Sequence, residues 1–244
     1  AFVAYAASIG LQLIPCLFPL YTTVPTYKGE TANALANSAS ASRAYLRSSV
    51  TEFVTRYNAS PAIAAWQFTN EWSNYSLLGV VPSGADSVLD VITQDALIDS
   101  LRDMAQAVRA VDSARAILSG NGGCWYSTTA NLYGLEGFAQ LMFAMNPDPI
   151  DTVSAHVYSS PDTGVWNRMG FEPLATIVGE MKRCAKPFVL GETGVPESLQ
   201  TLDRDKQLLT DLLESDGAPQ LTLMYNWYKP ESTSPSSNTS YDYY

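Results

Sequence analysis

Short apolar runs alternate along this chain with stretches in which apolar residues recur at helical spacing. Leu46, Val50, Phe53 and Tyr57 form one helical stripe, and the apolar run that follows has the length of a buried strand. This alternation predicts strands at residues 11–18, 62–69, 116–118, 152–158, 188–190 and 221–227. It predicts helices at residues 2–9, 46–57, 97–111, 135–145, 173–181 and 202–213, and a long loop over residues 19–42.

Strands that are separated by helices are typical of parallel βαβ units. Six such strands, with no linker and no break in composition, predict one α/β domain over residues 1–244, either open or closed into a barrel. The chain begins inside a helical pattern and ends in Ser-, Thr- and Tyr-rich sequence without a closing helix. We therefore expect about a unit's worth of structure to be missing at each end.

Charge and composition exclude several classes of partner. Fourteen Lys and Arg against 24 Asp and Glu give a net charge of −10, which repels nucleic acid and anionic lipid surfaces. No apolar run reaches the length of about 18 residues that a membrane span needs. One His and three Cys (Cys16, Cys124 and Cys184) lack the spacing of a zinc or iron–sulfur site, so we expect no metal and no cofactor. The odd number of cysteines fits either a reduced protein or one disulfide plus a free thiol.

The carboxyl ends of the predicted strands carry the candidate chemistry. Glu71 follows the second strand, His156 and Tyr158 lie in the fourth, Glu192 follows the fifth, and Trp227 ends the sixth. In parallel α/β proteins these ends meet on one rim, where active sites lie. Two carboxyl groups beside aromatic side chains are the requirement for cleaving a glycosidic bond, because one protonates the leaving oxygen while the other attacks or activates water.

Several segments carry a resemblance to a known family. They are residues 5–15, which resemble a second helix leading into a third strand, Thr-Asn-Glu-Trp at residues 69–72, His-Val-Tyr at 156–158, Gly-Glu-Thr-Gly at 191–194 and Trp227, in that order along the chain. With the alternation of strands and helices they resemble the retaining glycoside hydrolases of clan A, most closely glycoside hydrolase family 5, the cellulases and mannanases. The resemblance implies an eight-stranded (β/α)₈ TIM barrel whose first two strands are missing, so that about six βα units are visible.

The resemblance also implies roles for individual residues. Glu71 corresponds to the acid/base and Glu192 to the nucleophile. Four further residues would bind substrate or hold the nucleophile: Asn70, His156, Tyr158 and Trp227. The sequence departs from the family in two respects, since the basic residue of the second strand would precede Ala1, and Trp72 replaces the usual Pro.

Other interpretations of these residues stay open. A packing role in the core is the less favoured alternative for His156, Tyr158 and Trp227. Trp72 and Trp125 add aromatic faces on which a sugar could stack. The glycine run at residues 120–123 lacks the following Lys of a phosphate loop and predicts a tight turn.

The sequence therefore predicts a retaining glycosidase that acts on a neutral β-linked polysaccharide of the mannan or β-glucan type. The alternative is a carbohydrate-binding pseudoenzyme or an inactive fragment of the same fold. An esterase is disfavoured, because the chain has no G-x-S-x-G motif. The resemblance further implies a secreted protein, and we expect a monomer with a carbohydrate as its partner.

Overall fold

The computed structural model describes residues 1–75, 92–122, 140–158, 186–194, 210 and 221–224. All six predicted strands are present, and α3 and α4 are the helices expected at residues 46–57 and 97–111. Residues 140–144 are helical, whereas the helices expected at 173–181 and 202–213 lie outside the described residues, apart from residue 210. The named elements are α1 (Phe2–Ser8), β1 (Cys16–Phe18), α2 (Thr23–Lys28), η1 (Ala32–Ala36), α3 (Ala41–Tyr57), β2 (Ala65–Thr69), η2 (Trp72–Tyr75), α4 (Gln94–Arg109), β3 (Ala116–Leu118), β4 (Val153–Tyr158), β5 (Phe188–Gly194) and β6 (Leu221–Met224).

The six strands form two parallel sheets of three strands each. Their orders are β1-β2-β3 and β4-β5-β6, so each strand lies beside the next one along the chain. Trp66 of β2 pairs with Ile117 of β3, and Val153 of β4 pairs with Phe188 of β5. Parallel neighbours that follow one another in sequence confirm the predicted α/β class. A (β/α)₈ barrel that lacks its first two strands, with about six βα units, stays a prediction.

The two long helices begin one turn earlier than the apolar spacing predicts, because a polar side chain caps each of them. The Ser40 side chain accepts a hydrogen bond from the Arg43 amide at the start of α3. The Thr93 side chain does the same for the Ala96 amide at the start of α4. These caps satisfy amides that have no partner within the helix, so the helix extends back to the cap.

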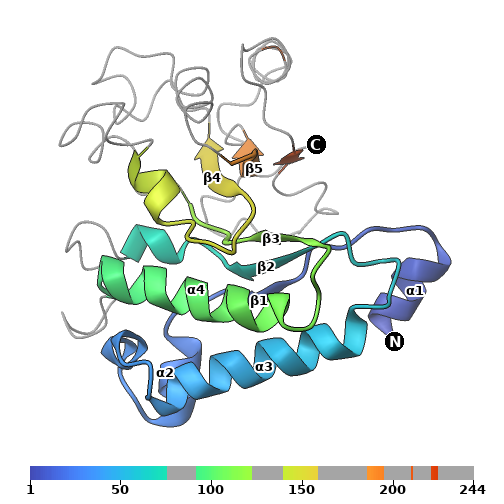
Figure 1. The fold of residues 1–244 in the computed structure, drawn as a ribbon. Helices are drawn as coiled ribbons and strands as arrows, with labels where there is room; N and C mark the ends of the chain where they lie inside the picture. The colour runs from blue at the N-terminus through green and yellow to red at the C-terminus, as the bar shows by residue number, and fades with distance from the viewer. Residues whose placement is uncertain (76–91, 123–139, 159–185, 195–209, 211–220, 225–244) are drawn as a thin grey trace, which may run out of the picture.

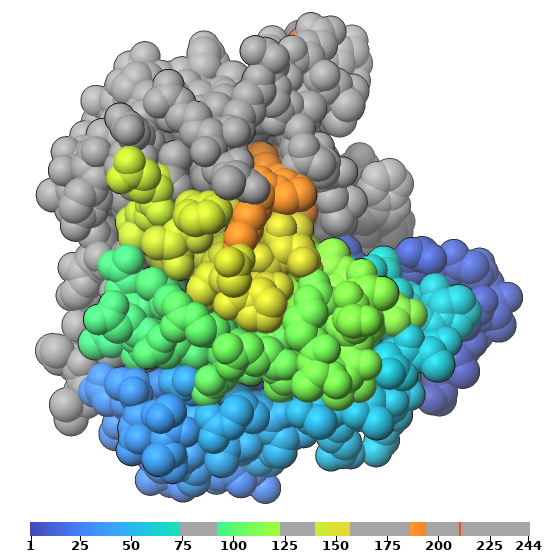
Figure 2. All heavy atoms as spheres, viewed as in Figure 1, coloured from blue at the N-terminus to red at the C-terminus, as the bar shows by residue number. Residues whose placement is uncertain are grey.

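The core lies between these helices and the first sheet. Trp66 and Phe68 of β2 are fully buried, while Gln67 between them is partly exposed, as expected when successive side chains of a strand point to opposite faces. Figure 1 shows α3 and α4 side by side along one face of β1, β2 and β3. In Figure 2 the segments 140–158 and 186–194 (yellow and orange) pack directly on this body. The helices thus cover one face of the sheet and leave the ends of its strands for the site.

Residues 19–42 are not the long loop that the composition predicts, because they contain α2 and η1. The carboxylate of Glu30 accepts hydrogen bonds from the Ser42 amide and hydroxyl, at 2.9 and 2.6 Å. The buried guanidinium of Arg43 donates to the Leu35 carbonyl at 2.8 Å. Long-range partners of this kind order a polar segment that has no helical periodicity, and local pattern carries no sign of them.

Asp112, after α4, is a buried carboxylate that ties the core together. It accepts hydrogen bonds from the indole N–H of Trp66 at 3.0 Å and from Arg115 at 2.8 Å, as well as from the Ala114 and Arg115 amides. Burial raises the pKa of Asp112, but the hydrogen bonds from Trp66, Arg115 and Ala114 together outweigh it and hold that pKa below its usual range. The charged carboxylate is therefore the form that the folded state favours.

We expect Asp112→Ala to lower the free energy of unfolding by about 3 kcal/mol, because it leaves the Trp66 N–H buried without an acceptor and removes the partner of Arg115. Glu52→Ala, which removes an exposed ion pair with Arg56, should cost less than about 1 kcal/mol. Urea unfolding measures both, and an equal cost for the two variants would contradict this role.

The contribution of Asp112 to stability should also depend on pH. Its pKa is lower in the folded than in the unfolded state, so the charged carboxylate stabilises the folded protein fully above the unfolded value of about 4, and this stabilisation is lost as the pH falls below that value.

None of the helices within the described residues is long and apolar enough to cross a bilayer.

Candidate active site

Glu71 stands at the carboxyl end of β2 in a left-handed backbone conformation. Its φ is 57°, and among the described residues it is the one non-glycine residue with a positive φ. Such a conformation costs about 1 to 2 kcal/mol for a residue with a Cβ, so the surrounding structure must hold it. The Glu71 amide donates to the Gly120 carbonyl at 2.8 Å, and the Thr69 amide donates to the Ser119 carbonyl at 3.0 Å. The segment after β3 therefore sets the direction in which Glu71 leaves the sheet.

Gly120 allows this contact because it has no side chain. Its φ is +77°, and a Cβ built there would lie 1.8 Å from the Thr69 carbonyl oxygen and 2.9 Å from the Gln67 side-chain nitrogen. Only glycine permits both the positive φ and the close approach of the two backbones. Residues 120–122, where the sequence predicts a tight turn, form no regular turn, and Gly123 lies outside the described residues. The end of β2 rests on the first glycine of this segment.

A buried polar cluster joins the two sheets beneath this segment. Ser119 donates to the Asn146 side chain at 2.6 Å, and its hydroxyl lies 2.8 Å from that of Ser154 on β4. The Ser154 hydroxyl accepts from the amides of Gly120 and Asn121, both at 3.2 Å. These side chains replace a regular ladder between β3 and β4, so the segment that supports Glu71 is fixed to β4.

Glu192 is brought to the same place by an irregularity in β5. Ala155 of β4 pairs with Leu190, but the next residue, His156, pairs with Glu192, so that Gly191 is an extra residue in β5. A Cβ at Gly191 would lie 2.9 Å from His156 Nε2. A bulge shifts every later side chain along the strand, and glycine is needed here because the imidazole packs against the backbone. The bulge puts Glu192 level with His156.

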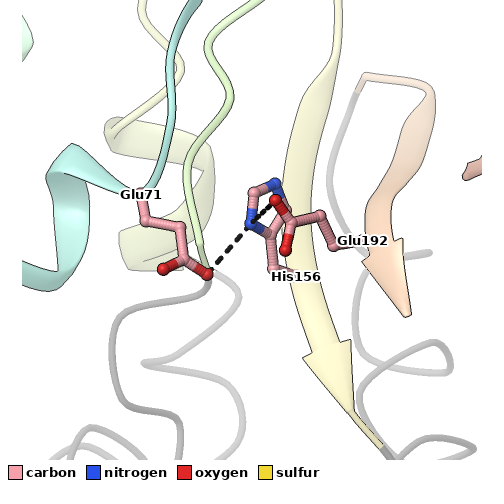
Figure 3. A group of neighbouring side chains, drawn as sticks. All are labelled: Glu71, His156 and Glu192. Carbon is pink, nitrogen blue, oxygen red and sulfur yellow. Dashed lines mark hydrogen bonds and ion pairs between the residues drawn. The ribbon is translucent and has the colours of Figure 1, made fainter. Parts of the chain in front are cut away.

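His156 lies between the two glutamates, as Figure 3 shows. Its Nδ1 is 3.0 Å from Glu71 Oε1 and 3.5 Å from Glu192 Oε1. The imidazole is buried, with 1% of its side chain exposed, against 31% for Glu71 and 18% for Glu192. Within the part of the chain that the structure describes, Nε2 has no hydrogen-bond partner. A proton on Nδ1 would therefore face both carboxylates and weaken their mutual repulsion.

The two carboxyl groups are close enough to act on one bond. Oxygens of Glu71 and Glu192 and the Nδ1 of His156 all lie within 4.8 Å of one another. Carboxyl groups are about 5 to 5.5 Å apart in retaining glycosidases, and about 6.5 to 9.5 Å apart in inverting ones, which must leave room for water. Oxygens within 4.8 Å of each other fit the shorter of these two separations. Among the described residues, these three side chains also form a group that could hold a metal ion.

The structure resembles several solved glycoside hydrolases. It matches an endo-β-1,4-mannanase from Thermotoga petrophila with a TM-score of 0.67 and 16% identity, over 99% of this chain and 55% of that one. It also matches the endoglucanase Cel5A catalytic domain from Thermobifida fusca (TM-score 0.52, 13% identity, 93% and 60%) and GH5_18 from Streptomyces cattleya (0.62, 14%, 92% and 54%). The chain has the fold of these glycoside hydrolases.

This chain spans little more than half the length of those glycoside hydrolases. No protein-family profile and no curated protein sequence matches it. At identities of 13 to 16%, these structural matches establish a common fold alone. They agree with the resemblance to family 5 noted in the sequence, and the activity has to be argued from the site itself.

Within this glycoside hydrolase fold, the other predicted site residues have different positions. Asn70 is partly exposed at the end of β2, next to Glu71. Trp72 is fully buried in the core, and its indole N–H has no partner among the described residues, so it offers no face to a sugar. Tyr158 is the last residue of β4, but its side chain lies outside what the structure describes, as do Trp125 and Trp227 altogether.

Sequence reasoning missed the residues that hold the glutamates. Gly120, Ser119 and Ser154 support Glu71, and Gly191 sets the register of Glu192. One signal was present, because Ser119 and Gly120 directly follow a strand and Gly191 directly precedes a candidate nucleophile. A small residue at the carboxyl end of a parallel strand is worth examining for close backbone contacts.

Proposed function

We propose that the chain is catalytic and is a retaining glycosidase acting on a neutral β-linked polysaccharide. The observation that carries this proposal is the pair formed by Glu71 and Glu192, whose carboxylate oxygens lie within 4.8 Å of each other on the ends of β2 and β5. This spacing favours double displacement over inversion. The fold shared with mannanases and an endoglucanase supports the same reaction class.

In the proposed mechanism Glu192 attacks the anomeric carbon while Glu71 protonates the departing glycosidic oxygen. A covalent glycosyl–Glu192 intermediate results, and Glu71, now ionised, takes a proton from the water that releases the sugar. His156 is 3.0 Å from Glu71 and 3.5 Å from Glu192, so an Nδ1 proton can follow the negative charge from one carboxylate to the other. The left-handed backbone at Glu71 aims its carboxyl group toward this position.

The substrate we propose is a mannan or a β-glucan. Two of the solved structures with the same fold are named as an endo-β-1,4-mannanase and as an endoglucanase, which supports a substrate of this kind. The proposed mechanism uses the two carboxyl groups and His156 of the protein and needs no cofactor. We retain the expectations of a secreted, monomeric protein as part of the proposal.

Hydrolysis of glucomannan, carboxymethylcellulose, mixed-linkage glucan and xylan tests this function. We expect the chain to release reducing sugar from glucomannan or one of the two glucans, and Glu192→Ala to release none. Glu52→Gln is the matched control, because Glu52 is an exposed carboxylate on α3, and it should retain the activity. Sugar binding without hydrolysis by the unaltered chain would contradict the enzyme and indicate a carbohydrate-binding pseudoenzyme.

A further inference from the structure

We propose that Glu71, His156 and Glu192 together bind a divalent cation of the Zn²⁺ type, and that this cation is an inhibitor of the site. The binding follows from the geometry of the three side chains. The inhibition rests on the proposed function, because it concerns the roles of the two glutamates in hydrolysis. Sequence spacing gives no indication of such a site, since its ligands come from three strands.

The three ligand atoms have nearly the separations that a small cation requires. Zinc binds His nitrogen and carboxylate oxygen at about 2.0 to 2.2 Å, so two ligands of a tetrahedral site are about 3.4 Å apart. His156 Nδ1 is 3.0 Å from one carboxylate oxygen and 3.5 Å from the other. The remaining pair, the oxygens of Glu71 and Glu192, lies within 4.8 Å. A small rotation of one carboxylate brings all three atoms around one ion.

The kind of ligands selects the kind of cation. An imidazole with two carboxylates suits Zn²⁺ and its neighbours, whereas Mg²⁺ and Ca²⁺ prefer oxygen ligands alone. The imidazole is buried, while both carboxylates are partly exposed to solvent, from which an ion would enter. Each carboxylate needs only its ionised form to bind, so the site is ready without a change of fold.

A cation in this position opposes both steps of the proposed reaction. It occupies a lone pair of Glu192 that would attack the anomeric carbon, and it holds Glu71 ionised, so that Glu71 cannot deliver a proton. It also takes the Nδ1 lone pair of His156 and displaces the proton from that nitrogen. We therefore expect hydrolysis to stop when the site is filled and to recover fully when EDTA removes the ion.

Nuclear magnetic resonance of the single histidine tests the site directly. The chain contains one His, so ¹⁵N-histidine labelling of protein without a histidine tag gives the two ring nitrogens of His156 alone. We expect ZnCl₂ to shift the Nδ1 signal saturably and MgCl₂ to leave it in place. Ring signals that stay unchanged in excess zinc would overturn the proposed site.

Two variants separate the ligands from the general charge of the protein. Glu71→Gln and Glu192→Gln should each raise the zinc concentration for half-maximal shift at least about tenfold, since each removes a charged ligand. Glu52→Gln removes the same charge from the exposed surface of α3 and should leave that concentration unchanged. An equal affinity in all four proteins would exclude these ligands.

The inhibition has its own readout. Zinc should suppress glycan hydrolysis over the concentrations that shift the histidine signal, with recovery in EDTA. A saturated histidine signal together with full hydrolysis would overturn the inhibition but not the site. If no glycan is hydrolysed under any condition, the proposed function fails, while the histidine signal still decides whether the cation binds.

Discussion

Glu71→Ala and Glu192→Ala should each lose glycan hydrolysis by on the order of 10⁴-fold, as removal of a group that takes part in covalent catalysis does in other enzymes. Both side chains are partly exposed at the ends of their strands, so neither substitution opens a cavity in the core. The fold should persist, and thermal unfolding measures this. The expected result is an inactive protein that still unfolds cooperatively near the temperature of the unaltered chain.

Sodium azide distinguishes the two roles, when an activated aryl β-glycoside is the substrate. In Glu192→Ala azide can take the place of the missing nucleophile and displace the aryl group, which gives the α-glycosyl azide. In Glu71→Ala the Glu192 ester still forms, and azide then displaces it to give the β-glycosyl azide. The opposite pair of products would reverse the assignment of acid/base and nucleophile. Glu52→Gln should form no azide product.

Gly120→Ala should lower the free energy of unfolding by about 3 kcal/mol and the rate of hydrolysis by about 100-fold, although Gly120 is not one of the two proposed catalytic glutamates. A Cβ at this position lies 1.8 Å from the Thr69 carbonyl oxygen, so β2 and the segment after β3 must move apart. That movement breaks the contact that holds the Glu71 amide on the Gly120 carbonyl. Urea unfolding and initial rates on the preferred glycan measure the two effects.

Gly29→Ala is the matched control for this substitution. Gly29 has a φ of +69°, close to the +77° of Gly120, but a Cβ there meets nothing within 4 Å. Its cost is the strain of the left-handed backbone alone, about 1 kcal/mol, with no effect on hydrolysis. If the two variants lose the same stability and Gly120→Ala keeps its activity, the contact with Thr69 does not position Glu71.

Local pattern predicted the strands because a buried parallel strand must be apolar over several residues, and β2 with Trp66 and Phe68 satisfies this. It failed for residues 19–42, where α2 and η1 are held by Glu30 and Arg43 through contacts with other elements. It also suggested Trp72 as a binding residue, because the sequence places an aromatic beside Glu71 and cannot say which way it points. The structure buries that ring in the core.

The candidate site likewise has one part that the sequence predicts and one part that it does not. Sequence order places Glu71 and Glu192 at the carboxyl ends of parallel strands, and those ends share a rim in any arrangement of this kind. His156 also lies in a predicted strand between them along the chain, and the resemblance to family 5 implied its role. The candidate pair was therefore predictable, whereas the distance between its carboxyl groups could be expected only from the retaining mechanism that the resemblance implies.

The sequence by itself determined the α/β class, the order of the strands and the residues at their ends, because these depend on periodicity and on neighbours along the chain. Only the tertiary structure decided that Gly191 adds a residue to β5, that His156 lies between the two glutamates, and that Gly120 supports the end of β2. These features depend on register and on contacts between residues tens of positions apart. Such contacts arise from packing, and no local pattern of apolar and polar residues encodes them.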